Sequence, residues 1–493
     1  MIAAWARICK ILGKAFEPYL PYVMEPVLKA AALKPDIAVL DADDMRVMEN
    51  DEDWEFVNVG EKHNFGIRTA GLDEKATACQ MLVCYAREMK EAFAPYMEET
   101  LKLMVPMLKF YFHDGVRMAA GEVLPCLLEC AKVRGDVYVQ EMWTYIIPYL
   151  LKALDSEPES EVLCELMAAF AQCIEIVNSH CLNHIHFVNL MGILNKHLVG
   201  HFERADMRAE KRKEEDYDEV LEETLIKEDD DDVYLLSKVA DIVCTLFAAY
   251  KEEFFVYFDD ILPHFVKLLE PSRPWPDRQW SLCVFADVIE YGGPLCSRYQ
   301  QYFLQPILLA LNDESPDVRQ TAAYAIGVLA QFGGPDYAKF CSESIPLLVQ
   351  MINDPDSRSE ENIRATENAI SAVTKFLSNI TSLNMEELIP VWVTWLPIWE
   401  DEEEAKYVYN FFCTLLETNN PYLLGRENCN LPKIVQIVAD AFLKEGIEAS
   451  SDVGKRIITL MKDIQINAEL FTICVNQLNS EQREALHTAL TAQ

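Results

Sequence analysis

The sequence predicts an all-α protein, a HEAT-repeat α-solenoid of about ten helix-pair repeats with two inserted segments. Three observations lead to this fold class. The chain has only 17 glycines in 493 residues. Its apolar residues recur at helical spacing, and alternating runs typical of strands are few. One pattern returns about every forty residues, a period typical of stacked helix pairs.

The clearest copy of the repeated helix lies in residues 312–334, NDESPDVRQTAAYAIGVLAQFGG. Ser315 suits the N-cap, Pro316 suits the first helical position, and Asp317 suits the positive end of the helix dipole. Small apolar residues such as Ala322 follow at helical spacing, and two glycines end the pattern. A helix with such small side chains is predicted to pack closely between other helices.

The same frame recurs along the chain when its first residue is counted as zero. Apolar residues then fall at +3, +4, +7, +10 and +11. The frames start at Met1, Lys75, Arg117, Leu163, Leu236, Arg278, Arg319, Thr366, Ala405 and Gly454. Seven of the nine steps between them span 39 to 49 residues, which leaves room for a second apolar helix in each. We therefore expect one solenoid over residues 1–493.

The two longest steps predict insertions at about residues 30–72 and 202–232. In the first, Trp54 and Phe56 stand among acidic residues and are expected to dock on the solenoid, with docking on a partner as the alternative. The second, strongly acidic insertion is interpreted as a solvated loop or helix extension, because charge runs usually are. A functional arm is the alternative. Its basic cluster at 211–213 is expected to pair within a helix.

Composition limits the kinds of partner. The formal net charge is −37, from 80 acidic and 43 basic residues, which argues against nucleic acid and anionic membranes and favours basic proteins. No uninterrupted apolar run has the length of a membrane span. Fifteen cysteines without a CxxC pair indicate buried free thiols in a reducing compartment, the cytosol or the nucleus.

Motifs for catalysis are missing from the sequence. It has no GxxxxGK, HExxH, GxSxG or GxGxxG pattern, so we expect neither enzymatic activity nor a cofactor. The segment HCLNHIH contains His180, Cys181, His184 and His186, which are conceivable metal ligands, but their spacing is irregular. No metal site is predicted there.

The positions +5, +9 and +12 of the frame share one helix face and carry mainly acidic residues. The row comprises Glu122, Glu129, Glu175, Asp241, Asp287, Glu290 and Glu417, interrupted by Arg87, Gln331 and Lys375. Stacking of the repeats aligns these positions, and we interpret the row as a binding surface for Lys/Arg-rich segments. The alternative is that these acids simply solvate an exposed helix face.

Four strings give the chain a family resemblance. They are FGIRTAGLDEKATACQMLVCYA at 65–86, LKFYFHDGVRMAA at 108–120, RPWPDRQW at 273–280 and WLPIWEDEEEAKYVYNFFCTLLE at 395–417. With them the chain resembles the C-terminal half of nuclear import receptors of the importin-beta family, in particular its beta-3 branch.

The resemblance implies a superhelical HEAT solenoid whose second helices line the inner surface, so that the acidic row faces inward. It further implies basic cargo such as ribosomal proteins and histones, contacts with nucleoporin FG repeats, cargo release by Ran-GTP, and shuttling between cytoplasm and nucleus. The principal Ran-binding repeats of the family lie in the N-terminal half, so Ran-GTP is expected to bind weakly here. The opening helix is expected to expose its stacking face.

Two other functions stay open on sequence grounds. One is a HEAT scaffold that organises a multiprotein complex and prefers particular folded partners over basic peptides. The other is a hydrolase whose site is scattered over several repeats.

Overall fold

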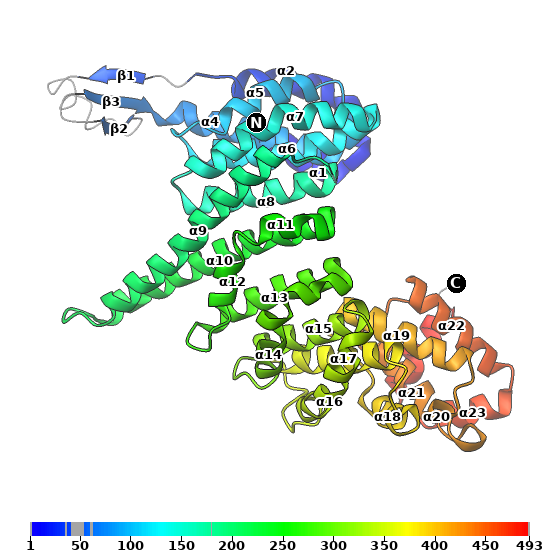
Figure 1. Cartoon of the computed structure of the whole chain (residues 1–493). Helices are drawn as coiled ribbons and strands as arrows, with labels where there is room; N and C mark the ends of the chain where they lie inside the picture. The colour runs from blue at the N-terminus through cyan, green and yellow to red at the C-terminus, as the bar shows by residue number, and fades with distance from the viewer. Residues whose placement is uncertain (1, 35–36, 41–53, 60–62, 179, 492–493) are drawn as a thin grey trace. The chain divides into compact units, whose positions relative to one another are not determined.

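A computed structural model describes residues 2–34, 37–40, 54–59, 63–178 and 180–491 and shows a predominantly helical chain (Figure 1). The chain divides into two compact units, Met1–His264 and Phe265–Gln493, and each is described by itself. The predicted helical solenoid class is confirmed. The expectation of one continuous solenoid over residues 1–493 stays a prediction.

In the first unit, a row of helices packs side by side, each on the next. The row consists of α4 (Thr69–Met89), α6 (Asp114–Ala131), α8 (Ser160–Val177) and α10 (Glu219–Tyr250). Its partner helices are α5 (Met97–Met107), α7 (Asp136–Ser156) and α9 (His184–Lys211). At the start of the row, α1 (Ile2–Leu12) and α2 (Leu20–Ala31) both pack on α4. The short helix α11 (Phe255–Phe258) contacts α9, and α12 (Leu262–Leu268) spans the unit boundary.

The second unit repeats this arrangement. Its row consists of α13 (Trp275–Gly292), α15 (Pro316–Phe332), α17 (Ile363–Asn379), α19 (Glu402–Glu417) and α22 (Asp452–Gln465). Between them lie α14 (Gln300–Ala310), α16 (Ala338–Ile352), α18 (Met385–Trp392), α20 (Pro421–Leu424) and α21 (Leu431–Leu443). The unit ends with α23 (Ala468–Asn476) and with α24 (Ser480–Thr491), which packs on α21.

The predicted frames coincide with the row helices. Nine of the ten frame starts lie inside α4, α6, α8, α10, α13, α15, α17, α19 and α22, and Met1 directly precedes α1. Helix α15 packs closely between its neighbours, as its sequence predicts, and its small residues Ala322 and Ala323 are fully buried. A Cβ on Gly327 would lie 3.1 Å from the Cα of Ala372 in α17, so this glycine permits close approach of the two helices.

The first inserted segment contains the strands of one small antiparallel sheet. Its strands are β1 (Ile37–Leu40), β2 (Trp54–Val59) and β3 (His63–Arg68), in the order β1-β3-β2. In the register of β2 with β3, Val57 lies opposite Phe65. These strands were too short for the periodicity of the sequence to predict. The expected docking of Trp54 and Phe56 concerns side chains outside the described residues.

The second inserted segment extends two helices instead of forming a loop. Helices α9 and α10 have 28 and 32 residues and lie side by side in Figure 1. Three arginines at four-residue spacing, two on α9 and one at its C-cap, pair with acids of α10. The pairs are Arg204 with Asp232, Arg208 with Asp229 and Asp232, and Arg212 with Glu222 and Asp229. The side chain of Arg208 is 5% exposed, so this acidic run serves helix pairing as well as solvation.

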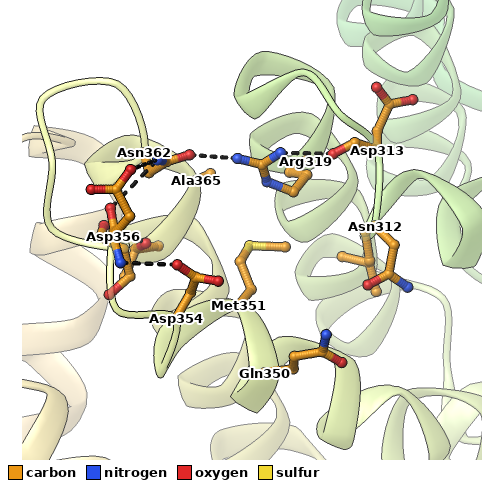
Figure 2. Close-up of a pocket in the computed structure, with 12 residues that line it drawn as sticks. Asn312, Asp313, Arg319, Gln350, Met351, Asp354, Asp356, Asn362 and Ala365 are labelled. Atoms are coloured by element: carbon orange, nitrogen blue, oxygen red, sulfur yellow. Dashed lines mark hydrogen bonds between the residues drawn. The ribbon is translucent and has the colours of Figure 1, made fainter.

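A polar contact at the frame start joins one repeat to the next. Lys75 donates to the carbonyl of Leu33 (2.9 Å), Arg117 to the carboxylate of Glu157 (2.9 Å), Arg278 to Asp313 (2.8 Å), and Arg319 to Asn362. Figure 2 shows Arg319 between Asp313 and Asn362, at the edge of a polar cavity of about 280 Å³. Each contact ties the start of a row helix to a turn of the neighbouring repeat.

One stretch within Glu219–Phe258 has the length and composition of a membrane span. About 61% of it is buried inside the protein. This burial is typical of the core helix of a packed repeat.

We expect Ala322→Leu to lower the free energy of unfolding by about 1–3 kcal/mol, because the packed face of α15 has no room for three added carbons. Urea denaturation measures the change. The matched control is Ala248→Leu on the exposed side of α10, which should leave the transition nearly unchanged. An unaltered transition for Ala322→Leu would contradict the close packing of α15.

Arg117→Met should destabilise the first unit by about 3–5 kcal/mol, because it leaves the carboxylate of Glu157 buried without its cation. The double variant Arg117→Met, Glu157→Met removes that charge and should be more stable than the single variant. Arg134→Met, which breaks a surface pair with Glu98, is the control and should have little effect. Equal losses for Arg117→Met and Arg134→Met in urea denaturation would refute the role of the buried pair.

Candidate partner-binding surface

The seven predicted site carboxylates all lie on the side of the row helices that faces away from the buried apolar stripe, here called the outward side of each helix; the orientation toward the inner surface that the family resemblance implies stays a prediction. In the first unit they are Glu122 and Glu129 on α6, Glu175 on α8, and Asp241 on α10; in the second they are Asp287 and Glu290 on α13, and Glu417 on α19. They reach this side because the apolar stripe of the same helices is buried. Glu129, Glu175 and Glu417 are exposed, and the other four are half-buried.

Cations neutralise most of the row in the first unit. Arg87 of α4 donates to Glu122 at 2.7 Å, and this hydrogen bond raises the pKa of Arg87. Lys132 lies 2.6 Å from Glu129, and Lys238 lies 3.1 Å from Asp241. Arg87, which interrupts the acidic row in the sequence, is therefore the ion-pair partner of Glu122.

Glu175 differs from the other acids of the first unit. Among the residues that the structure describes, its carboxylate has no hydrogen-bond or ion-pair partner, and it is exposed. An incoming cation would meet no internal competitor there.

One arginine engages the whole outward stripe of α19. Arg456 of α22 donates to both carboxylate oxygens of Glu417 at 2.6 Å, and its guanidinium also bonds Asn410 and Thr414. The hydrogen bonds from Arg456 lower the pKa of Glu417. Arg456 was not predicted from the sequence, although it follows Glu417 by 39 residues, which is close to one repeat.

The acids of α13 have an aromatic neighbour. The hydroxyl of Tyr324 in α15 donates to Glu290 at 3.3 Å. Burial, followed by the charges of Glu290, Glu404 and Asp287, raises the pKa of Tyr324. Next to this ring, Lys375 of α17 is buried, bonds both oxygens of Glu404 at 2.8 and 2.9 Å, and lies 4.9 Å from the centre of the Tyr324 ring. Tyr324 and Glu404 were not singled out from the sequence.

Most carboxylates of the row are therefore in ion pairs, and Glu290 instead accepts a hydrogen bond from Tyr324. Exposed pairs of this kind contribute about 0–1 kcal/mol each, so an incoming lysine or arginine can replace the internal cation at little cost. The same exchange also yields little net affinity. The α13 acids lie in a less solvated setting, where a charge interacts more strongly with a ligand.

The histidine-rich segment has structural roles in the protein. His186 forms a capping box with Asn183 at the start of α9, His184 lies 3.2 Å from the hydroxyl of Tyr257, and the sulfur of Cys181 lies 3.2 Å from the hydroxyl of Tyr250. The described part of the chain contains no group of three potential ligands that would hold a metal ion. All fifteen cysteines are free thiols, and burial raises the pKa of Cys130 to about 12.

An apolar groove lies between α7 and α9 in the first unit. Its volume is about 700 Å³, and its lining includes Pro148, Leu151, Ile185, Val188 and Ile193. Ile185 is 68% exposed and Val188 52%, so both side chains are open to a ligand. This groove was not predicted from the sequence.

Comparison with known proteins supports the same architecture. The family model for importin repeat 6 matches residues 162–271, and the HEAT repeat model matches residues 303–333. Importin subunit beta-3 of Saccharomyces cerevisiae is 29% identical over 464 residues, which cover 92% of this chain and 42% of the relative. The probable importin-5 homolog of Dictyostelium discoideum is 24% identical over 98% of this chain and 45% of its own length.

A solved structure agrees with these relatives. The crystal structure of the karyopherin Kap121p bound to the SUMO protease Ulp1p superposes with a TM-score of 0.81 and 26% identity over 99% of this chain and 44% of Kap121p. The chain thus spans less than half the length of the relatives that it matches. Its paired helices and repeat motifs are thus similar to those of importin-beta family proteins.

Proposed function

We propose that the protein takes part in nuclear transport as a receptor that binds basic cargo by surface complementarity, without catalysis. The observation that carries this proposal is the set of outward carboxylates on the row helices of an importin-beta family solenoid. The formal net charge of −37 adds a long-range attraction for cationic partners. A receptor of this kind works in both the cytoplasm and the nucleus.

The cargo is proposed to present Lys/Arg-rich segments like those of ribosomal proteins and histones. Kap121p, a karyopherin of similar structure, has been crystallised bound to Pho4p and bound to Ste12p, which supports a protein partner for this chain. On this chain, Asp287 and Glu290 are the best placed acids, because they are half-buried beside Tyr324. Glu175 offers a carboxylate with no internal cation among the described residues.

Two further partners complete the proposal. The apolar groove between α7 and α9 suits the aromatic side chains of nucleoporin FG repeats, because it is open and lined by aliphatic residues. Ran-GTP is proposed to act only weakly on this chain. Kap121p has been crystallised with RanGTP, but the family resemblance assigns the principal Ran contacts to other repeats.

Basic peptides should bind this chain with an affinity that falls steeply as salt rises from about 50 to 300 mM, because screening weakens the carboxylate contacts. Charge reversal at Glu129, Asp287 and Glu290 should weaken binding by about tenfold or more, whereas reversal at Glu214, Glu215 and Asp216 in the α9–α10 turn should change it less than about twofold. Fluorescence anisotropy with a labelled histone-tail peptide measures both. Equal effects of the two triple variants would indicate attraction to net charge alone.

Saturating Ran-GTP should change the affinity for the same peptide by less than about threefold, under about 1 kcal/mol, because coupling between two ligands requires both of their sites. The titration is repeated with Ran-GDP as the control. A tenfold loss of affinity that depends on GTP would show that these repeats contain a release switch of their own.

A further inference from the structure

The second unit has a groove at the N-terminal end of α19, far along this helix from Glu417. Its larger part has a volume of about 1040 Å³ and an apolar floor that includes Trp399, Phe442, Ile447 and Val453. A smaller part of about 410 Å³ continues to α24. The two parts share the lining residues Phe442, Glu445, Ile447 and Ala449.

The aromatic wall of this groove is held in place before any ligand arrives. The backbone N–H of Trp399 donates to the carboxylate of Glu367 at 2.8 Å, and the Glu367 side chain is fully buried. The ammonium of Lys444 lies 3.3 Å from the centre of the Trp399 ring, and the guanidinium of Arg358 lies 5.4 Å from it. A ring fixed by two cations and an anchored backbone loses little freedom when a ligand packs on it.

A close backbone approach fixes the width of the groove. A Cβ on Gly446 would lie 2.6 Å from the carbonyl oxygen of Ile398 and 2.9 Å from the Cα of Trp399. The turn between α21 and α22 therefore sits directly against the loop that precedes α19. The residues that line the groove on both sides of this contact keep a fixed spacing.

The rim of the groove is acidic. It carries Glu400, Glu402, Glu445, Glu448, Glu481 and Glu484 against only Lys406 and Lys455. Lys406 is already paired with Glu402 and Glu403. Within the described residues, Glu400, Glu445, Glu481 and Glu484 have no cationic partner, and all four are exposed.

We propose that this groove is a second docking site, for a peptide segment that has one or two large apolar side chains flanked by lysines or arginines. The apolar side chains pack on Trp399, Phe442 and Ile447, and the cations pair with the rim acids. Charge complementarity selects this occupant, because an acidic segment would be repelled and a purely apolar one would leave the rim carboxylates without partners. The site is separate from the acidic row, so either can fail without the other.

The test uses the fluorescein-labelled peptide KKFKKLKK and a matched peptide KKSKKSKK, which keeps the lysines and lacks the apolar side chains. Anisotropy titrations are made on the full chain and on the row variant Glu129→Lys, Asp287→Lys, Glu290→Lys, which removes binding at the acidic row. In the row variant we expect KKFKKLKK to bind with micromolar affinity and at least about fivefold more tightly than KKSKKSKK.

Adding Glu481→Lys and Glu484→Lys to the row variant should weaken KKFKKLKK at least about fivefold, whereas the matched pair Glu360→Lys and Glu361→Lys, exposed outside the groove, should change it less than about twofold. Thermal melts check that every variant remains folded, including the row variant with its half-buried positions Asp287 and Glu290. Loss of all peptide binding in the row variant, equal affinity for the two peptides, or equal effects of the two glutamate pairs would each overturn the second site.

Discussion

The contact between the frame-start residue, which lies in the first two turns of a row helix, and the neighbouring repeat constrains the stacking of this solenoid. Apolar burial is non-directional and by itself tolerates small shifts of one helix along another. A buried guanidinium is different, because Arg117 must meet Glu157 or remain uncompensated at a cost of several kcal/mol. The second unit has equivalent contacts, in which Arg278 donates to Asp313 and Arg319 donates to Asn362. These contacts select one register for successive row helices.

That register decides what each unit offers to a partner. It turns the stripe of acids outward, and it also places Arg87 against Glu122 and Arg456 against Glu417. The surface is therefore less negative than its carboxylates alone suggest. Binding there is an exchange of one weak ion pair for another, which favours reversible contacts. Such contacts agree with the proposed role of a receptor that releases its cargo.

The chain combines surfaces of different chemistry on similar helix pairs. The α9–α10 extension is held together by arginines that pair across the two helices with acids such as Asp229 and Asp232. The groove beside α19 has the opposite balance, with apolar floor residues and several rim acids that no internal cation engages among the described residues. The repeat supplies the scaffold, and the turns between helices supply the differences in specificity.

Much of the fold was predictable because hydrophobic periodicity is a local property of the sequence. It located the row helices, the narrow α15 and the helix positions of the seven acids. It missed the strands of the first insertion, because runs of four to six residues are too short to show a clear alternation. It also could not assign partners such as Arg456 for Glu417 or Lys375 for Glu404, which lie 39 and 29 residues apart. The sequence by itself determined the helices and their faces. The tertiary structure decided which charges meet and where α19, α21, α22 and α24 form a groove, because both depend on the stacking of neighbouring repeats.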